Sequence, residues 1–165
     1  MKPLRSVLAL ACVVGLAAPA LAETCLRPAE QSALHVRALQ SRLMVGALAC
    51  RQEAAFNDFV RRNTGELGNA YRTAESHFRR TVGAQGQRRW NQVDTELAAM
   101  QSQEYAGLGG FFCTDTTAFF QQTAALSSGE ALARFAVERN EIQAYSAPVC
   151  TSTTPSRPAR PARRT

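Results

Sequence analysis

Residues 28–51, PAEQSALHVRALQSRLMVGALACR, carry the pattern that decides the fold. Apolar residues recur here at steps of three and four, which places them on one face of an α-helix. The recurring residues are Val36, Leu39, Leu43, Ala47 and Cys50. Pro28 suits the first turn of a helix, where its missing N–H is not needed. We therefore predict a helix over about residues 28–51 that buries one face.

A second helix is predicted to begin near Glu53 and to end at the glycine-rich turn Gly83–Gly86. Its apolar residues keep the same spacing from Phe56 to Phe78. Asparagine and glycine are weak helix formers, so Asn63-Thr64-Gly65 is expected to kink or break this helix.

Two further helices are predicted around Trp90–Met100 and around Phe112–Leu126. Ser127-Ser128-Gly129-Glu130 matches a capping box, with Ser127 as N-cap and Glu130 at the third helical position, and it opens a short fifth helix. No segment has a convincing strand pattern. The sequence therefore predicts an all-α fold, an up-down bundle of four to five helices.

The two ends of the chain differ from this helical body. Residues 1–22 have a positive start, an apolar run from Val7 to Ala18 and the small-residue triplet Ala20-Leu21-Ala22, which are the parts of a cleaved export signal. A lipoprotein site at Cys12 is a poorer match because the apolar run before it is too short. Residues 151–165 are rich in proline and arginine and have no large apolar residue. We expect residues 23–150 to form the domain and residues 151–165 to be a disordered basic tail.

Charge follows the same division. After removal of residues 1–22, the chain keeps 17 arginines, no lysine and 13 acidic residues. Four of the arginines lie in residues 151–165, so the body over residues 23–150 has no net charge. A neutral exported body makes nucleic acid the least expected partner.

Four cysteines remain after the signal, namely Cys25, Cys50, Cys113 and Cys150. An even number in an exported protein indicates two disulfides, and the absence of a CxxC motif argues against a redox pair or a zinc knuckle. A helix over the roughly 22 residues between Cys25 and Cys50 would span about 33 Å. That span is too long for a disulfide between them. Two pairings survive, and the up-down order favours Cys50–Cys113 with Cys25–Cys150.

The chain contains no recognisable catalytic or metal-binding motif. Its two histidines, His35 and His77, stand outside HExxH and Glu-x-x-His patterns, so each is expected to be an ordinary surface or boundary residue. The absence of lysine after position 2 excludes Schiff-base chemistry in the mature chain. We expect no metal, no cofactor and no enzymatic activity.

Five arginines bracket the predicted turn at Gly83–Gly86 and are the best candidate site. These residues are Arg72, Arg79, Arg80, Arg88 and Arg89. Two antiparallel helices that meet at this turn would gather the charges at one end of the bundle, where they could bind an anionic group of a protein or of the cell envelope. The competing interpretation is a solvated helix end that complements the helix dipole.

Aromatic residues are expected mostly in the core. Phe111-Phe112 and Phe119-Phe120 are adjacent pairs, and adjacent helical residues cannot both face one apolar stripe. One member of each pair is therefore expected to be exposed or to seal a second interface, which favours a homodimer or a hydrophobic groove.

The segments CLRPAEQSALHVRALQSRLMVGALACR (residues 25–51), FNDFVRR (residues 56–62) and FFC (residues 111–113) resemble small exported four-cysteine helical proteins of alphaproteobacteria. This resemblance implies an exported helical fold and no particular activity. A more partial resemblance connects LRPAEQ (residues 26–31) to the LTxxQ motif of Spy/CpxP-type periplasmic chaperones. Here the threonine is missing, the glutamine is one place late, and those chaperones do not depend on two disulfides.

Three functions follow from these observations. The first is a non-catalytic periplasmic or secreted protein that binds another protein or an envelope component. The second is a holdase-like stress chaperone that uses exposed aromatic residues and the arginines near Gly83–Gly86, and the third is a small secreted helical enzyme.

Overall fold

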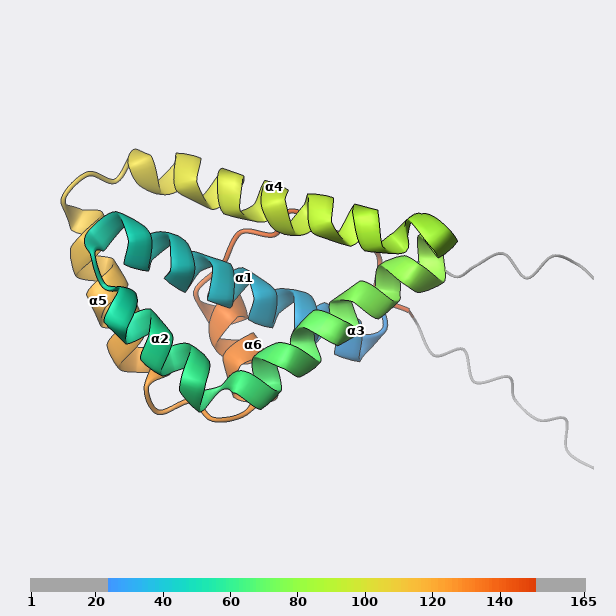
Figure 1. Ribbon diagram of the computed structural model, residues 1–165, viewed down its shortest axis with the longest axis horizontal. Helices are drawn as coiled ribbons and strands as arrows, with labels where there is room; N and C mark the ends of the chain where they lie inside the picture. Colours follow the sequence, from blue (N-terminus) through green and yellow to red (C-terminus); the bar gives the residue numbers. More distant parts are fainter. Residues whose placement is uncertain (1–23, 151–165) are drawn as a thin grey trace, which may run out of the picture.

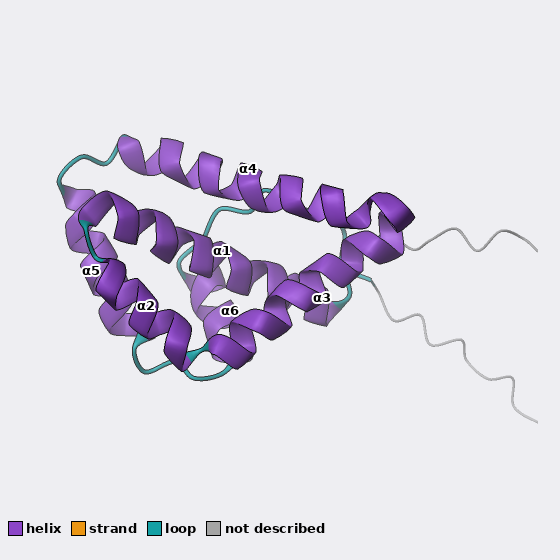
Figure 2. Cartoon of the chain, viewed as in Figure 1, coloured by secondary structure: helices purple, strands orange, loops and turns teal. Residues whose placement is uncertain are grey.

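Helices make up the regular structure of residues 24–150, the part of the chain that the computed structural model describes. They are α1 (Pro28–Cys50), α2 (Glu53–Arg62), α3 (Thr64–Val82), a 3-10 turn (Gly83–Gln85), α4 (Gly86–Ala106), α5 (Phe111–Thr123) and α6 (Gly129–Glu138). Figure 2 shows these helices joined by loops, with no strand drawn. The predicted all-α class is confirmed. The expected signal and basic tail lie outside the described residues.

Helix α1 is the central element, and α3, α4, α5 and α6 all pack against it. Figure 1 shows α1 and α4 running in the same direction. Helices α2 and α3, which connect them along the chain, together run in the opposite direction. This is the alternation of an up-down bundle. No helix among residues 24–150 is both long enough and apolar enough to cross a membrane.

The core lies along α1, as the three- and four-residue spacing predicts. Leu39 and Leu43 are completely buried, and Phe78 of α3, Trp90 of α4 and Leu132 of α6 close over them. Full burial of a side chain of this size stabilises the fold by about 1.5–3 kcal/mol. The helices are therefore held by shared contact with α1.

The predicted second helix is broken at Asn63 into α2 and α3. The Asn63 side chain is buried, and its Nδ2 donates a 3.0 Å hydrogen bond to the carbonyl of Phe59. A side-chain bond of this kind competes with the helical backbone and favours a bend. The break lets α2 contact α5 while α3 contacts α4.

The start of α6 differs from the sequence prediction by one residue. Ser128, not Ser127, is the N-cap, and its hydroxyl accepts a 3.2 Å hydrogen bond from the N–H of Ala131. The N–H of Gly129 donates instead to the carboxylate of Glu66 at 2.9 Å. This long-range bond from α3 takes part in fixing where the helix begins, which a local motif could not reveal.

The cysteines pair as the up-down argument expects. Cys25 bonds Cys150 with a Cα–Cα distance of 5.0 Å, and Cys50 bonds Cys113 with a Cα–Cα distance of 5.4 Å. Beside the first bridge, the N–H of Leu26 donates to the carbonyl of Pro148, and the N–H of Cys150 donates to the carbonyl of Leu26. The beginning and the end of the domain are therefore fastened together.

The two phenylalanine pairs behave differently. In the first pair, Phe111 is 86% exposed and Phe112 is buried, as expected. In the second pair, both Phe119 and Phe120 are buried, which fits the other predicted outcome, a second interface, and not exposure. The reason is that α5 is covered by α1 and also by α2, which gives this helix two buried sides.

Candidate functional site

The five arginines of the predicted site lie at the middle of α3 (Arg72), on its last turn (Arg79, Arg80) and on the first turn of α4 (Arg88, Arg89), and each has a partner. Arg79 bonds Glu75 at 2.8 Å, and Arg89 lies 3.9 Å from Glu96. The partners of Arg72 and Arg88 are the amide oxygens of Asn69 and Gln85. An anion would have to displace these contacts, so the structure offers it no ready-made pocket here. The arginine site therefore stays a prediction.

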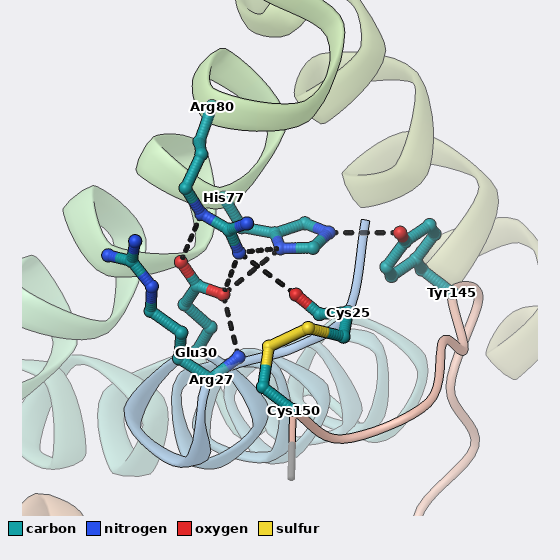
Figure 3. Close-up of a disulfide and its surroundings, with 7 residues drawn as sticks. All are labelled: Cys25, Arg27, Glu30, His77, Arg80, Tyr145 and Cys150. Carbon is teal, nitrogen blue, oxygen red and sulfur yellow. Dashed lines mark hydrogen bonds and ion pairs between the residues drawn. A yellow bond between two sulfur atoms is a disulfide. The ribbon is translucent and has the colours of Figure 1, made fainter. Parts of the chain in front are cut away.

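Arg80 leaves this group and turns toward α1. Its Nη2 donates to the Glu30 carboxylate at 2.6 Å and to the carbonyl of Cys25 at 2.9 Å. Glu30 also accepts the backbone N–H of Arg27 at 2.9 Å, which caps the first turn of α1. One arginine therefore ties the end of α3 to the start of α1 and to the disulfide segment (Figure 3).

His77 extends this cluster into the C-terminal segment. Its Nδ1 lies 3.1 Å from Glu30, and its Nε2 lies 2.9 Å from the hydroxyl of Tyr145. Figure 3 shows the imidazole between the carboxylate and the phenol, next to the Cys25–Cys150 bridge. His77 is completely buried, so the expectation of a surface or boundary histidine is wrong. His35, by contrast, is half-buried and meets Gln143.

Burial lowers the pKa of His77 and the positive charge of Arg80 lowers it further, which outweighs the opposite effect of Glu30. Burial alone would raise the pKa of Glu30, but the hydrogen bonds from Arg80, Arg27 and His77 outweigh it and hold this pKa below its ordinary value. The ring is then neutral beside a carboxylate. Its Nδ1 lies within hydrogen-bond distance of both Glu30 and Nη2 of Arg80, and its Nε2 shares a hydrogen bond with the Tyr145 hydroxyl.

A carboxylate, an imidazole and a hydroxyl in a row also occur in catalytic triads, where the hydroxyl faces a substrate. Here the imidazole has no exposed surface, and the Tyr145 ring packs on Phe78 with a centroid distance of 4.8 Å. We assign the cluster a structural role: it joins α1, α3 and the C-terminal segment through hydrogen bonds in a buried setting.

The other end of the molecule carries an apolar groove between α1, α4 and the start of α5. It has a volume of about 430 Å³, and its main lining residues are Val45, Leu48, Ala49, Tyr105, Ala106 and Phe112. Figure 1 shows the C-terminal ends of α1 and α4 and the N-terminal end of α5 together at this end.

Large apolar side chains are exposed in the segments that line this groove. Leu48 lines it and is 65% exposed. Leu108 is 48% exposed and Phe111 is 86% exposed, and both lie in the segment between the lining residues Ala106 and Phe112. The Cys50–Cys113 bridge joins the end of α1 to the residue after Phe112, so it holds the two sides of the groove in place. We call the groove together with Leu108 and Phe111 the apolar end surface. The adjacent phenylalanines predicted a hydrophobic groove, and only the fold shows that α1 and α4 supply its walls.

Among residues 24–150, no group of three or more histidine, cysteine, aspartate or glutamate side chains is placed to hold a metal ion. Comparison with protein-family models, with curated proteins and with solved structures finds no match. The function must therefore be argued from the geometry.

Proposed function

We propose that this chain is a non-catalytic, exported helical protein that binds another protein through its apolar end surface. The observation that carries the proposal is an apolar groove lined by exposed Leu48, together with the exposure of Leu108 and Phe111 in the segment between the lining residues Ala106 and Phe112. An almost fully exposed phenylalanine next to an apolar groove is typical of a contact surface, because leaving it in water has a free-energy cost that a partner removes.

The disulfides support this assignment in two ways. First, two bridges are compatible with an exported protein, and the sequence of residues 1–22 favours the periplasm or secretion. The Cys50–Cys113 bridge also fixes the surface before binding, which lowers the entropy lost when a partner docks.

Affinity capture with two variants tests the proposal. Wild-type protein and Phe111→Ser would be used as baits against the exported proteins of the source cells. Val137→Ser is the matched control, because Val137 is 55% exposed on α6, away from the groove. We expect a partner that wild type and Val137→Ser retain and that Phe111→Ser loses by tenfold or more, about 1.4 kcal/mol. A partner retained equally by all three would place the contact elsewhere.

Two alternatives use the same surface and give different outcomes. A homodimer would appear as a concentration-dependent change in sedimentation of the purified protein, abolished by Phe111→Ser. A holdase would suppress aggregation of unrelated unfolded clients and would capture many proteins without preference. Either result would replace the proposal of one specific protein partner.

A further inference from the structure

The turn between α3 and α4 lies far from the apolar end surface and is rich in arginine. Figure 1 shows this turn and the start of α5 at opposite ends of the molecule. Residues 76–93, which run through the turn, contain four arginines and no acidic residue. They are Arg79, Arg80, Arg88 and Arg89. We call residues 79–89 the arginine tip.

Close packing at Gly86 holds the two arms of the arginine tip together. A Cβ atom at this position would lie 2.5 Å from Cα of Arg79, so the first residue of α4 touches the backbone of the last turn of α3. Gly83 turns the chain with a φ of 63°, which glycine adopts without strain. Arg79 of α3 and Arg88 of α4 are therefore kept at the same end of the molecule.

The ion pairs of α3 keep the acidic partner more covered than the arginine. The Arg79 side chain is 63% exposed, whereas the side chain of its partner Glu75 is 15% exposed. Arg80 is 19% exposed and its partner Glu30 is 5% exposed. A large surface that approaches this end therefore meets guanidinium groups before it meets carboxylates.

Other arginines at this end are less closely paired with acids. Within residues 24–150, the side-chain partner of Arg88 is the neutral amide oxygen of Gln85, so no ion pair cancels its charge. Arg89 lies 3.9 Å from Glu96, at the outer limit of an ion pair. Arg27 is exposed just before α1. This end therefore has an excess of positive charge, although the body over residues 23–150 has none.

Residues 151–165 add four more arginines and no acidic residue. The chain enters this segment from Cys150, which is bonded to Cys25. The carbonyl of Cys25 accepts a 2.9 Å hydrogen bond from Arg80, and Figure 3 shows these three residues together. The four arginines are therefore attached to the end of the molecule that carries the arginine tip.

An exposed apolar side chain lies between the arginines of the tip. Val82 is 45% exposed, and the three residues after it are exposed as well. Apolar side chains flanked by arginines are typical of segments that enter the headgroup layer of a membrane, where the guanidinium groups stay among the lipid phosphates. Phe78 and Trp90 are buried, so neither ring offers a stacking platform to a nucleic acid.

We propose that the arginine tip, together with Arg27 and the arginines of residues 151–165, is a docking surface for an anionic lipid bilayer. The contact is peripheral: guanidinium groups pair with lipid phosphates, and Val82 enters the headgroup layer. A small anion would need a pocket and would have to displace the present partners of the arginines. A fluid bilayer needs neither, because its headgroups move to charges that are already exposed. The proposal does not depend on the partner of the apolar end surface, which lies at the other end.

The affinity should depend on lipid charge and on salt. Each arginine close to an anionic bilayer raises the partition coefficient by a factor of about five. Raising sodium chloride from about 0.1 M to about 1 M shortens the Debye length from about 10 Å to about 3 Å. The high salt concentration should therefore weaken binding by about tenfold or more.

The test is co-sedimentation of the purified, oxidised protein, starting at Glu23, with lipid vesicles. One set of vesicles contains phosphatidylcholine and phosphatidylglycerol, and the other contains phosphatidylcholine alone. We expect the partition coefficient to be about tenfold or more higher for the anionic vesicles in low salt, and the difference to be lost in high salt. No binding to the anionic vesicles, or equal binding to both sets, would overturn the proposal.

Two double variants with the same loss of charge locate the contact. Arg88→Gln/Arg89→Gln should weaken binding to anionic vesicles by about tenfold or more. Arg61→Gln/Arg62→Gln changes two exposed arginines of α2, away from the arginine tip, and should weaken it by about twofold or less. Equal effects of the two variants would show that net charge alone matters and would overturn the assignment to the tip.

Replacement of the four arginines of residues 151–165 by glutamine tests the second part of the surface. This variant should also bind anionic vesicles about tenfold or more weakly, because the four charges act at the same end as the tip. Unchanged binding would contradict a shared docking surface.

Val82→Ser separates a bilayer from a soluble polyanion. It should weaken binding to anionic vesicles by about threefold and leave binding to heparin unchanged, because only a bilayer offers an apolar layer to Val82. Val137→Ser, which changes an exposed valine of α6, should alter neither. If Val82→Ser binds the vesicles as tightly as wild type, the surface recognises negative charge alone, and the lipid assignment is wrong.

Discussion

The imidazole Nδ1 of His77 lies 3.1 Å from the carboxylate Oε2 of Glu30, a residue 47 positions earlier in the chain. Both side chains are buried. This contact and the bond from Tyr145 to the other ring nitrogen join α1, α3 and the C-terminal segment. At this end of the molecule, the Cys25–Cys150 disulfide and the hydrogen-bonded cluster therefore lie side by side and hold the same segments together (Figure 3).

Replacement of His77 by leucine should destabilise the protein by about 2–4 kcal/mol, because Glu30 and the Tyr145 hydroxyl each lose a buried hydrogen-bond partner. Urea denaturation at neutral pH would measure the change. His35→Leu is the control, since His35 is half-buried and its hydrogen bond to Gln143 is long at 3.3 Å. We expect His35→Leu to cost under about 1 kcal/mol. Equal losses of unfolding free energy in the two variants would show that the buried cluster stabilises the protein no more than the contact of His35 with Gln143.

Acid should weaken the same cluster in two stages. The pKa of His77 is lowered in the folded protein, so its stabilising effect is complete above the unfolded value of 6.5 and is lost as the pH falls below it. The pKa of Glu30 is also lowered, so its contribution is lost as the pH falls below the ordinary value of 4.5. Comparison of the free energy of unfolding with that of His77→Gln, measured from pH 7 downward, isolates the first stage. A parallel decline in both proteins below pH 6.5 would argue against it.

Glu141 should have the opposite effect. Because its folded pKa is raised from 4.5 to about 7, the protein binds an extra proton when folded, and this stabilisation is present below pH 4.5 and lost as the pH rises through 7. The loss should be about 1–3 kcal/mol. Glu141→Gln should remove this decline. The measurement is the difference in free energy of unfolding between variant and wild type from pH 5 to pH 8, and a constant difference would exclude the shift.

Gly46 of α1 lies directly against Thr116 of α5. A Cβ atom at this position would lie 2.7 Å from Cγ2 of Thr116 and 3.0 Å from a guanidinium nitrogen of Arg42. Gly46→Ala should therefore destabilise the protein by about 1–3 kcal/mol through overpacking, despite the better helix propensity of alanine.

Gly65 is the matched control for this substitution. It lies in α3 with no atom near the position of an added Cβ. Gly65→Ala should stabilise the protein by up to about 1 kcal/mol. Thermal unfolding should show a lower melting temperature for Gly46→Ala and a higher one for Gly65→Ala. Stabilisation by Gly46→Ala would contradict the predicted steric conflict.

The two disulfides should stabilise the fold by similar amounts, but only one of them should affect binding. They close loops of 125 and 63 residues, and chain-entropy arguments predict a loss of about 2–5 kcal/mol when either is replaced by a serine pair. Only the Cys50→Ser/Cys113→Ser variant should weaken binding at the apolar end surface, because only that bridge ties the start of α5, which carries Phe111 and Phe112, to the end of α1. Affinity capture with both double variants would check this. Equal effects on binding would mean that the bridge does not position the surface.

Local pattern was sufficient for the helices and for the connections between them. The α1 stripe from Val36 to Cys50 follows from helical periodicity, which is a property of neighbouring residues. The length of α1 excluded a Cys25–Cys50 bridge, and the up-down order of the helices then favoured the observed pairing over the other one that remained. The arginines near Gly83–Gly86 were also found on the predicted helix ends, but their partners were not foreseen, since Glu30 reaches Arg80 from another helix.

The sequence by itself determined the helical class, the approximate positions of the helices and the spacing that excludes a Cys25–Cys50 bridge. Tertiary structure alone decided which polar residues were buried: His77 and Arg42 look like surface residues in their own helices and lie in the interior of the fold. The physical reason is that hydrophobic periodicity is encoded within about two helical turns. The partners that make a buried charge tolerable come from distant segments, and they meet only when the helices have packed.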